Sequence, residues 1–296
     1  MTTVNHTTAE IATQPDLWAR AAALAADCAG LPSPGERVAI VGCGTSWFIG
    51  QAYAVLRERA GLGVTDAFAA SEFPGVRDYD RVIALTRSGT TTEVLRLLAE
   101  IRGTVATTAI TGTPGTPIVT AADELVMLDF ADERSVVQTR FATTALALLR
   151  AHVGADLDGA VRDAKEAVAW LPEPEFVGAE QFTFLGSGWS VGLAAEAALK
   201  MREAAGAWTE SYPVMEYRHG PISIAAPNRV TWVFGPVPEG LAEQVAATGG
   251  TFVAGALDPM AELVRVQKLA VAIAESRGLN PDEPRHLTRS VVLDAS

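Results

Sequence analysis

The chain contains two similar stretches, VAIVGCGTS at residues 38–46 and FTFLGSGWS at residues 182–190. In each, a short apolar run leads into a glycine-containing turn, and a helical stretch follows, to about Arg59 in the first and Ala205 in the second. A strand, a tight turn and a helix in succession form the unit from which parallel sheets are built. Both stretches therefore predict an α/β fold.

The spacing of the two stretches indicates an internal duplication. Matching positions are separated by a constant offset of 144 residues, and a second motif further along the chain shares this offset. The matched pairs are Gly42 with Gly186, Gly44 with Gly188, Ser46 with Ser190, and Glu72-Phe73 with Glu216-Tyr217. One offset across two separated motifs predicts two copies of one subdomain, because solenoid repeats have much shorter periods.

Further apolar runs alternate with helical stretches. The expected strands are Ala67–Ala70, Val82–Leu85, Val105–Ile110, Leu125–Phe130, Val230–Phe234 and Phe252–Ala256, and the expected helices include Leu17–Leu31, Thr91–Ile101 and Pro259–Glu275. This alternation predicts mostly parallel sheets covered on both faces. We expect two doubly wound subdomains related by duplication.

Proline-rich stretches suggest where these parts begin and end. Pro32-Ser33-Pro34-Gly35 follows the first helical stretch, and Pro172-Glu173-Pro174 follows the helical region Ala142–Trp170. The predicted segments are an N-terminal helical segment at 1–34, a first phosphate-binding subdomain at 35–153, a helical linker at 154–176, and a second subdomain at 177–296 whose C-terminal tail enters the site.

The amino-acid composition limits which classes of partner the protein can bind. Acidic residues outnumber basic ones 35 to 23, for a net charge of −12, which disfavours nucleic acid as a partner. A small anion is still possible, because backbone N–H groups can hold a phosphate on an acidic protein. Since the chain shows neither an apolar run of membrane length nor a secretory signal, we expect a cytoplasmic protein with no membrane partner. Its two cysteines, Cys28 and Cys43, are expected to be buried thiols.

The loop after the strand Val82–Leu85 is rich in hydroxyl groups. Residues 86–92 read TRSGTTT, so five of the seven side chains carry a hydroxyl. At the carboxyl end of a parallel strand, such a loop presents hydroxyl and N–H groups at a helix N-terminus, which favours an anion such as phosphate. Capping of the helix by one hydroxyl is the alternative interpretation.

The turn at Gly44-Thr45-Ser46 is a second candidate for ligand contact. A dinucleotide fingerprint needs a third glycine at position 47, where this chain has Trp47. Gly186, Gly188 and Gly192 come closer to that pattern, but the second half has no counterpart of the hydroxyl-rich loop, since residues 235–240 read GPVPEG. We therefore expect a single phosphate site, in the first half; a tight packing turn is the alternative for Gly44-Thr45-Ser46.

The second half offers acid–base groups. Glu196, Lys200 and Glu203 are spaced i, i+4 and i+7, so they share one helical face. This face is either a solvated, salt-bridged surface or part of a site beside the glycine turn. His219 falls in the turn Arg218-His219-Gly220-Pro221, where a histidine able to exchange protons near neutral pH is expected to be functional.

These motifs, in this order, resemble the isomerase half of glutamine–fructose-6-phosphate amidotransferase and its stand-alone relatives, which are tandem sugar-isomerase (SIS) domain proteins. The resemblance extends over nearly the whole chain. It is carried by Glu10-Ile11, Gln14-Pro15, Gly44-Thr45-Ser46, Ser88-Gly89-Thr90-Thr91, Glu133, Val136, Gln138-Thr139, Ala198-Leu199-Lys200, Glu203, His219-Gly220-Pro221, Pro284-Arg285 and Leu287. The short segment before the first strand predicts a protein without a glutaminase domain.

The resemblance implies roles for individual residues. The phosphate would be held by Gly44, Thr45, Ser46, Ser88 and Thr91, with Thr86 and Arg87 where the family has Ser and Gln. Val136 and Gln138 would contact the sugar, and Glu203, beside Lys200, would move a proton between C1 and C2. His219 would assist ring opening across the interface of a homodimer.

One residue departs from the family pattern. Arg289 stands where the amidotransferase has a lysine that forms a Schiff base. A guanidinium, with a pKa above ~12, cannot act as an amine nucleophile. We therefore expect Arg289 to pair with phosphate or to stabilise enediolate charge without an imine.

Together these features predict an aldose–ketose isomerase of a sugar phosphate, of the type that releases ammonia from an amino-sugar 6-phosphate. No cofactor or metal is expected, because the four histidines have no ligand spacing. Two alternatives remain: a phosphosugar-binding sensor with little catalysis, and a lyase that splits sugar-phosphate–amino-acid conjugates.

Overall fold

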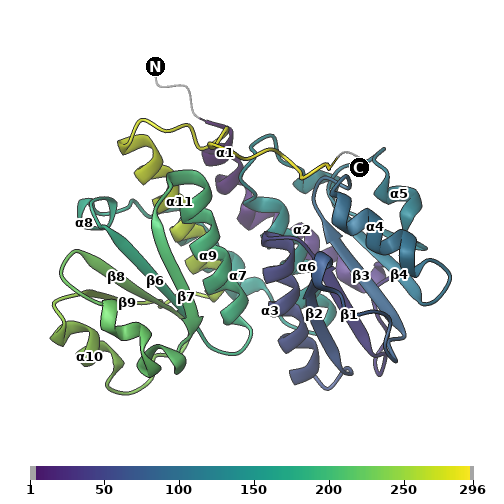
Figure 1. The fold of residues 1–296 in the computed structure, drawn as a ribbon, viewed down its shortest axis with the longest axis horizontal. Helices are drawn as coiled ribbons and strands as arrows, with labels where there is room; N and C mark the ends of the chain where they lie inside the picture. The colour runs from purple at the N-terminus through teal and green to yellow at the C-terminus, as the bar shows by residue number, and fades with distance from the viewer. Residues whose placement is uncertain (1–4, 294–296) are drawn as a thin grey trace. The chain divides into compact units, whose positions relative to one another are not determined.

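The computed structural model describes residues 5–293 and divides them into two compact units (Figure 1). The five-strand unit comprises residues 16–133, 140–157 and 288–293, and the four-strand unit comprises residues 5–15, 134–139 and 158–287. Residues 1–4 and 294–296, the outer ends of the predicted segments 1–34 and 177–296, lie outside the described residues. The predicted segment boundaries stay a prediction.

The five-strand unit is built on a parallel sheet with the strand order β2-β1-β3-β4-β5. Its strands are β1 (Val38–Gly42), β2 (Thr65–Ala69), β3 (Arg81–Thr86), β4 (Ala106–Thr111) and β5 (Glu124–Met127). Its helices are α2 (Gln14–Leu24, which starts at the boundary), α3 (Thr45–Arg59), α4 (Thr92–Ile101), α5 (Ile118–Ala121) and α6 (Arg140–His152), with short 3₁₀ turns at Ala25–Asp27, Ala70–Glu72 and Asp129–Ala131.

The four-strand unit is also built on a parallel sheet, with the order β7-β6-β8-β9. Its strands are β6 (Gln181–Gly186), β7 (Trp208–Pro213), β8 (Arg229–Phe234) and β9 (Thr251–Ala254). Its helices are α1 (His6–Ala12), α7 (Asp158–Ala169), α8 (Pro174–Val177), α9 (Ser190–Ala205), α10 (Leu241–Ala247) and α11 (Pro259–Ser276), with 3₁₀ turns at Glu216–His219 and Pro221–Ile224.

The two sheets share one topology, which confirms the predicted duplication of an α/β subdomain. In each, the first strand is central, the second pairs on one side, and the third and fourth follow on the other. The backbone repeats as well: Gly44 has φ 53° and Gly188 has φ 56°, a left-handed conformation that suits glycine. A Cβ on Gly42 would lie 2.6 Å from the Cβ of Ser46, so each helix can start directly against its strand only if glycine stands there.

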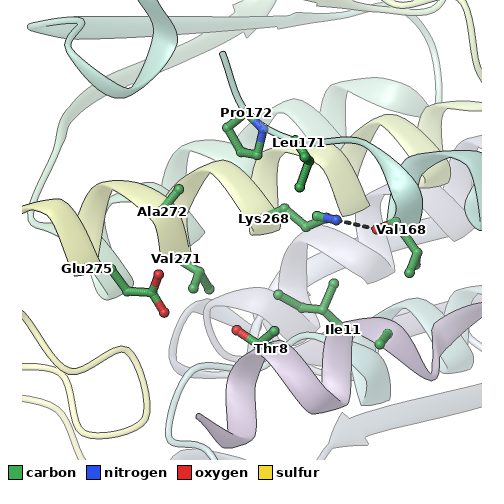
Figure 2. Close-up of a pocket in the computed structure, with 10 residues that line it drawn as sticks. Thr8, Ile11, Val168, Leu171, Pro172, Lys268, Val271, Ala272 and Glu275 are labelled. Atoms are coloured by element: carbon green, nitrogen blue, oxygen red, sulfur yellow. Dashed lines mark hydrogen bonds between the residues drawn. The ribbon is translucent and has the colours of Figure 1, made fainter. Parts of the chain in front are cut away.

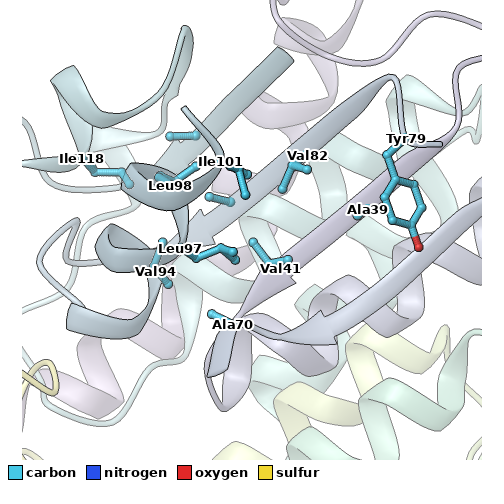
Figure 3. Packing of buried hydrophobic residues seen from close by; sticks show 12 residues of the cluster. Ala39, Val41, Ala70, Tyr79, Val82, Val94, Leu97, Leu98, Ile101 and Ile118 are labelled. Atoms are coloured by element: carbon cyan, nitrogen blue, oxygen red, sulfur yellow. The ribbon is translucent and has the colours of Figure 1, made fainter. Parts of the chain in front are cut away.

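Helices cover both faces of the five-strand sheet because every central strand is buried on both sides. Ala39 and Val41 face α4, whose Leu97 and Leu98 pack in the same cluster (Figure 3). Ile40 points to the opposite face, where it contacts the helix α3 at Gly50. Side chains alternate along a strand, so a continuous apolar run is what a sheet covered on two faces requires.

The four-strand sheet repeats this division. Val233 of β8 packs in a cluster with Leu241 and Val245 of α10. Its neighbour Trp232 points to the other face and donates a hydrogen bond from Nε1 to Oε2 of Glu262 on α11, at 3.1 Å. The core of each unit therefore lies on both sides of its sheet, and the carboxyl ends of the strands remain at the edge where ligands bind in this class of fold.

Several predicted elements differ from the structure. The strand expected at Leu125–Phe130 ends at Met127 and gives way to a 3₁₀ turn, and the helix expected at Leu17–Leu31 ends at Leu24. The edge strand β7 and the helix α10 were not predicted. Cys28 and Cys43 are free thiols, as expected, but both are half-buried instead of buried. Between residues 5 and 293, no helix is both long and apolar enough for a membrane span.

Candidate functional site

The hydroxyl-rich loop connects β3 to α4 at the carboxyl edge of the five-strand sheet. Thr86, Arg87 and Ser88 are buried. Thr91 is the N-cap residue of α4, yet its side chain makes no capping hydrogen bond. Capping therefore does not explain the hydroxyls, and the N-terminus of α4 retains its preference for an anion.

Short contacts inside the loop fix its shape. Gly89 has φ 65°, and a Cβ there would lie 2.2 Å from Oγ1 of Thr116, so only glycine fits. The Gly89 N–H donates to Oγ1 of Thr86 (3.3 Å), and the Thr90 N–H donates to Oγ of Ser88 (3.3 Å). By contrast, the N–H groups of Ser88 and Thr91 find no acceptor in the part of the chain that the structure describes. These two N–H groups, with the adjacent hydroxyls, are donors available to a ligand.

Arg87 is held by protein groups on both its backbone and its side chain. Its carbonyl oxygen accepts hydrogen bonds from the Gly112 N–H and from Oγ1 of Thr113, both at 3.1 Å. Its guanidinium lies 3.7 Å from the carboxylate of Glu133 and donates to the carbonyl of Arg289 at 2.9 Å. The guanidinium thus anchors the loop; its predicted contact with phosphate stays a prediction.

The turn at Gly44-Thr45-Ser46 lies at the same sheet edge, because β1 and β3 are adjacent parallel strands. Thr45 and Ser46 are buried at the start of α3. In the second copy, the hydroxyl of Ser190 is fully used, since it accepts from the Ser187 N–H (2.9 Å) and donates to the Phe234 carbonyl (2.7 Å). Within residues 5–293 the matching hydroxyl of Ser46 makes no such bond, so only the first copy keeps this group available for a ligand.

Three charged side chains on α9 form a buried cluster in the four-strand unit. Glu196 and Lys200 are 0% and 1% exposed, whereas 20% of the Glu203 side chain is exposed. The Lys200 ammonium lies 3.5 Å from Oε1 of Glu196 and donates a hydrogen bond to Oε2 of Glu203. The predicted shared face is therefore a buried ion cluster, and its interpretation as a solvated surface is wrong.

Glu203 lines a cavity of about 720 Å³. Arginines surround it: Arg202 beside it on α9, Arg277 after the end of α11, and Arg285 from the segment that follows. Arg277 donates to the Ala205 carbonyl at 2.8 Å, at the C-terminal end of α9. A carboxylate on a protein of net charge −12 thus opens into a pocket with a local excess of positive charge, which suits an anionic ligand.

The remaining predicted site residues occupy several places. Val136 and Gln138 belong to the segment 134–139, which Glu10 orders by accepting hydrogen bonds from the Arg134 N–H and from Oγ of Ser135, both at 2.5 Å. Gln138 buries its side-chain oxygen, and the described residues offer that oxygen no donor. His219 ends a 3₁₀ turn and is exposed on this single chain. Apart from the place of Glu10-Ile11 among the stretches that resemble the family, nothing local in the sequence indicated this role for Glu10.

A further cavity, of about 370 Å³, contains none of the predicted site residues (Figure 2). Its walls come from α1, α11 and the end of α7, and are mainly apolar, including Ile11 and Val271. Lys268 donates to the Val168 carbonyl in this cavity, as Figure 2 shows, and burial lowers the pKa of the Lys268 ammonium. We assign this cavity no role in the chemistry.

Comparisons with known proteins agree with this arrangement. The model of the SIS domain family matches residues 33–153. This match identifies a SIS domain in that part of the chain. Glutamine–fructose-6-phosphate aminotransferases (isomerizing) from Xanthomonas campestris and Gloeobacter violaceus are 28% and 29% identical to it, each over 88% of this chain. The chain spans only about half of these relatives, 52% of the length of each.

Solved structures share the fold over nearly the whole chain. A glucosamine-6-phosphate deaminase from Thermotoga maritima superposes with a TM-score of 0.79 at 23% identity, covering 97% of this chain and 100% of the deaminase. A tagatose-6-phosphate ketose/aldose isomerase from Escherichia coli gives the same TM-score at 19% identity, covering 98% and 96% of the two chains. These likenesses show that both sheets belong to the fold of the phosphosugar isomerases.

The chemistry available to this protein follows from two groups of residues. One group, in the five-strand unit, combines hydroxyls, N–H donors and a helix N-terminus, which together suit a phosphate. The other group, in the four-strand unit, combines a partly exposed carboxylate with a buried ammonium, which suits proton transfer at carbon. Among residues 5–293, no three His, Cys, Asp or Glu side chains are grouped to hold a metal ion.

Proposed function

We propose that this protein is an aldose–ketose isomerase of a sugar phosphate, and that its substrate is an amino-sugar 6-phosphate from which it releases ammonia. One observation carries the proposal: the N–H groups of Ser88 and Thr91, which find no acceptor among the described residues, occur in the same chain as the buried Lys200 that holds the Glu203 carboxylate. The names of the aminotransferase and deaminase relatives support the substrate class.

In the proposed reaction the phosphate is bound by the 86–91 loop and the Gly44-Thr45-Ser46 turn. Glu203 takes the proton from C2 of the open-chain aldose and returns it to C1, while Lys200 fixes the orientation of the carboxylate. With an amino sugar, the proton shift leaves an imine at C2, and one water molecule hydrolyses it to the ketose phosphate and ammonia. The balance is one water consumed for each ammonia released, and no covalent bond to Arg289 is required.

Turnover assays test this function. Hexose 6-phosphates and hexosamine 6-phosphates are supplied with their unphosphorylated forms as controls, and ketose and ammonia are measured separately. We expect ketose and ammonia in equal amounts from a hexosamine 6-phosphate, and neither from the unphosphorylated sugar. Stabilisation by sugar phosphates without any turnover would instead identify a binding sensor.

We further propose that the protein works in the cytoplasm as a homodimer in which His219, exposed on the single chain, opens the sugar ring in the partner's site. Mixing an E203Q variant with an H219N variant tests this sharing. If the site is shared, random mixing should restore roughly a quarter of the wild-type activity, because half of the dimers are hybrids and each hybrid has one intact site. No recovery would place both residues in the site of one chain.

A second candidate function, a lyase of sugar-phosphate–amino-acid conjugates, is favoured by the arginines around Glu203. A cavity of about 720 Å³ lined by Arg202, Arg277 and Arg285 has the volume and the charge for a second anionic group. Release of a free amino acid from such a conjugate, faster than release of ammonia from the amino sugar, would favour the lyase.

A further inference from the structure

The C-terminal segment 288–293 lies along the hydroxyl-rich loop and the start of α4, all within the five-strand unit. The carbonyl of Val291 accepts a hydrogen bond from the Thr92 N–H at 3.1 Å, and the Leu293 N–H donates to Oγ1 of Thr92 at 2.9 Å. The tail thus satisfies one of the N–H groups that helix starts leave without an intrahelical partner. Thr92, the first residue of α4, therefore links the helix to the tail.

Arg289 fixes this tail through its side chain and its backbone. Its guanidinium donates to Oδ1 of Asp132 (2.5 Å), to Oγ1 of Thr113 (3.3 Å) and to the Glu133 carbonyl. Its own carbonyl accepts the hydrogen bond from Arg87. A guanidinium can hold a carboxylate and two further acceptors at once because its donors are arranged in a planar fork, and the single ammonium of a lysine lacks that geometry.

Ser290 connects the tail to the proposed anion site. Its hydroxyl lies 2.8 Å from Oγ1 of Thr90, which in turn donates to Oγ of Ser88 at 3.1 Å. The three hydroxyls form a chain that ends on the residue whose N–H group is open to a ligand. Direct hydrogen bonds therefore connect Ser88 to Ser290 of the tail.

We propose that Arg289 is a positioning residue: its ion pair with Asp132 latches the tail onto the 86–91 loop, and the latched tail adds the Ser290 hydroxyl to the anion site. The chemical class of the ligand, a phosphate group, rests on the proposed function. Binding and latching are linked, so an anion that favours the docked tail is itself bound more tightly when the tail is docked. In this proposal Arg289 holds the tail in place through contacts with other protein groups, whereas the sequence predicted a contact with the phosphate or the enediolate.

Hydrogen exchange of the full-length protein without any ligand tests the latch. The variants are R289M and D132N, and the control is R96M, which removes an exposed arginine from α4, the same helix that the tail contacts. We expect the amides of Thr92 and of the tail to exchange at least 10-fold faster in R289M and D132N, with unchanged exchange in β1 and β3 and no effect of R96M. Unchanged tail exchange in R289M would overturn the latch.

Inorganic phosphate tests the coupling to the anion site without requiring a sugar or turnover. In the wild type, phosphate should slow exchange at Thr92, and R289M and S290A should each weaken phosphate binding at least 3-fold. The charge-exchanged double variant D132R/R289D should recover the affinity that R289D alone loses, since Asp132 and Arg289 are both about one-third exposed and tolerate the exchange. Wild-type affinity in both R289M and S290A would refute the coupling.

The outcomes separate this inference from the proposed function. If R289M frees the tail and weakens phosphate binding while no sugar phosphate is turned over, the latch stands and the proposed function fails. If sugar phosphates are turned over and R289M leaves KM unchanged, the latch fails and the proposed function stands. For both to hold, R289M must raise KM at least 3-fold with kcat within about 2-fold of the wild type, as loss of ground-state binding requires.

Discussion

The buried ammonium of Lys200 donates a hydrogen bond to the carboxylate of Glu203, one turn further along α9. The same ammonium faces the fully buried Glu196 at 3.5 Å. One cation therefore compensates two carboxylates inside the four-strand unit, and Glu203 lines the cavity of about 720 Å³. This arrangement assigns proton transfer to Glu203, and charge compensation and orientation to Lys200.

Replacing Lys200 by glutamine should damage both stability and catalysis. The change leaves Glu196 buried without its cation, and breaking a buried pair in this way typically costs about 3–5 kcal/mol. We expect a lower Tm and a loss of at least ~10² in kcat, because Glu203 loses the group that orients it. Thermal unfolding and initial rates give the two numbers, and K165Q, at an exposed lysine on α7, is the control. A wild-type Tm in K200Q would mean that the buried pair is not formed.

Replacing the matched serines Ser46 and Ser190 by alanine should affect different properties: binding in the first case and stability in the second. Ser190 makes structural hydrogen bonds to Ser187 and Phe234, so S190A should lower the free energy of unfolding by ~1 kcal/mol or more. Ser46 has no matching bond in the described chain, so S46A should leave Tm unchanged and weaken sugar-phosphate binding by roughly 10-fold, the usual size of a hydrogen bond to a charged group. Denaturation and calorimetric titration of both variants test this. Loss of stability in S46A with intact binding would contradict the phosphate assignment.

Asp282 should make the attachment of α1 sensitive to acid. Its carboxylate accepts hydrogen bonds from the His6 N–H (2.8 Å) and from the N–H and hydroxyl of Thr7 (both 2.7 Å). Burial alone would raise the pKa of Asp282, but these hydrogen bonds outweigh burial and lower the pKa below its ordinary value of 3.8. A carboxyl whose pKa is lower in the folded state stabilises the fold above pH 3.8, and that contribution is lost as the pH falls through the folded pKa.

The D282N variant measures this contribution. At pH 7 it should unfold about 1 kcal/mol more easily than the wild type, because a neutral amide oxygen accepts the hydrogen bonds from His6 and Thr7 more weakly than a carboxylate does. The difference should shrink as the pH is lowered, whereas E283Q, next to it in the sequence and exposed, should follow the wild type. Urea titrations at several pH values provide the test. A difference that stays constant down to the acid limit would show that the charge of Asp282 is not involved.

The sequence predicted much of the fold because the decisive features are local. The constant offset of 144 residues located β1 and β6 and the turns after them, and the matched glycines Gly44 and Gly188 both have a positive φ. The strand β7 was missed because its sequence, WTESYP, lies at a sheet edge and has no continuous apolar run. Turn residues such as Leu128, which ends the strand predicted at Leu125–Phe130, depend on packing that a short sequence window does not contain.

Only part of the candidate site could be predicted from the sequence, because some of its contacts join residues that are far apart along the chain. The hydroxyls of the 86–91 loop and the i, i+4, i+7 spacing of Glu196, Lys200 and Glu203 can be recognised locally. The partners of Arg289 cannot, because Asp132 lies 157 residues away along the chain. The burial of Glu196 and Lys200, which separates an ion cluster from a solvated helix face, likewise depends on what packs against α9.

The central claim is that Glu203 is the base that acts on a sugar bound through its phosphate, and an E203Q variant tests it most directly. Rates of ketose and ammonia formation from a hexosamine 6-phosphate, and the Kd of the same compound, are measured on one preparation. We expect a rate lower by at least ~10² with a Kd within a few-fold of the wild type, because glutamine keeps the shape of the side chain and removes the base. A rate equal to that of the wild type would contradict it.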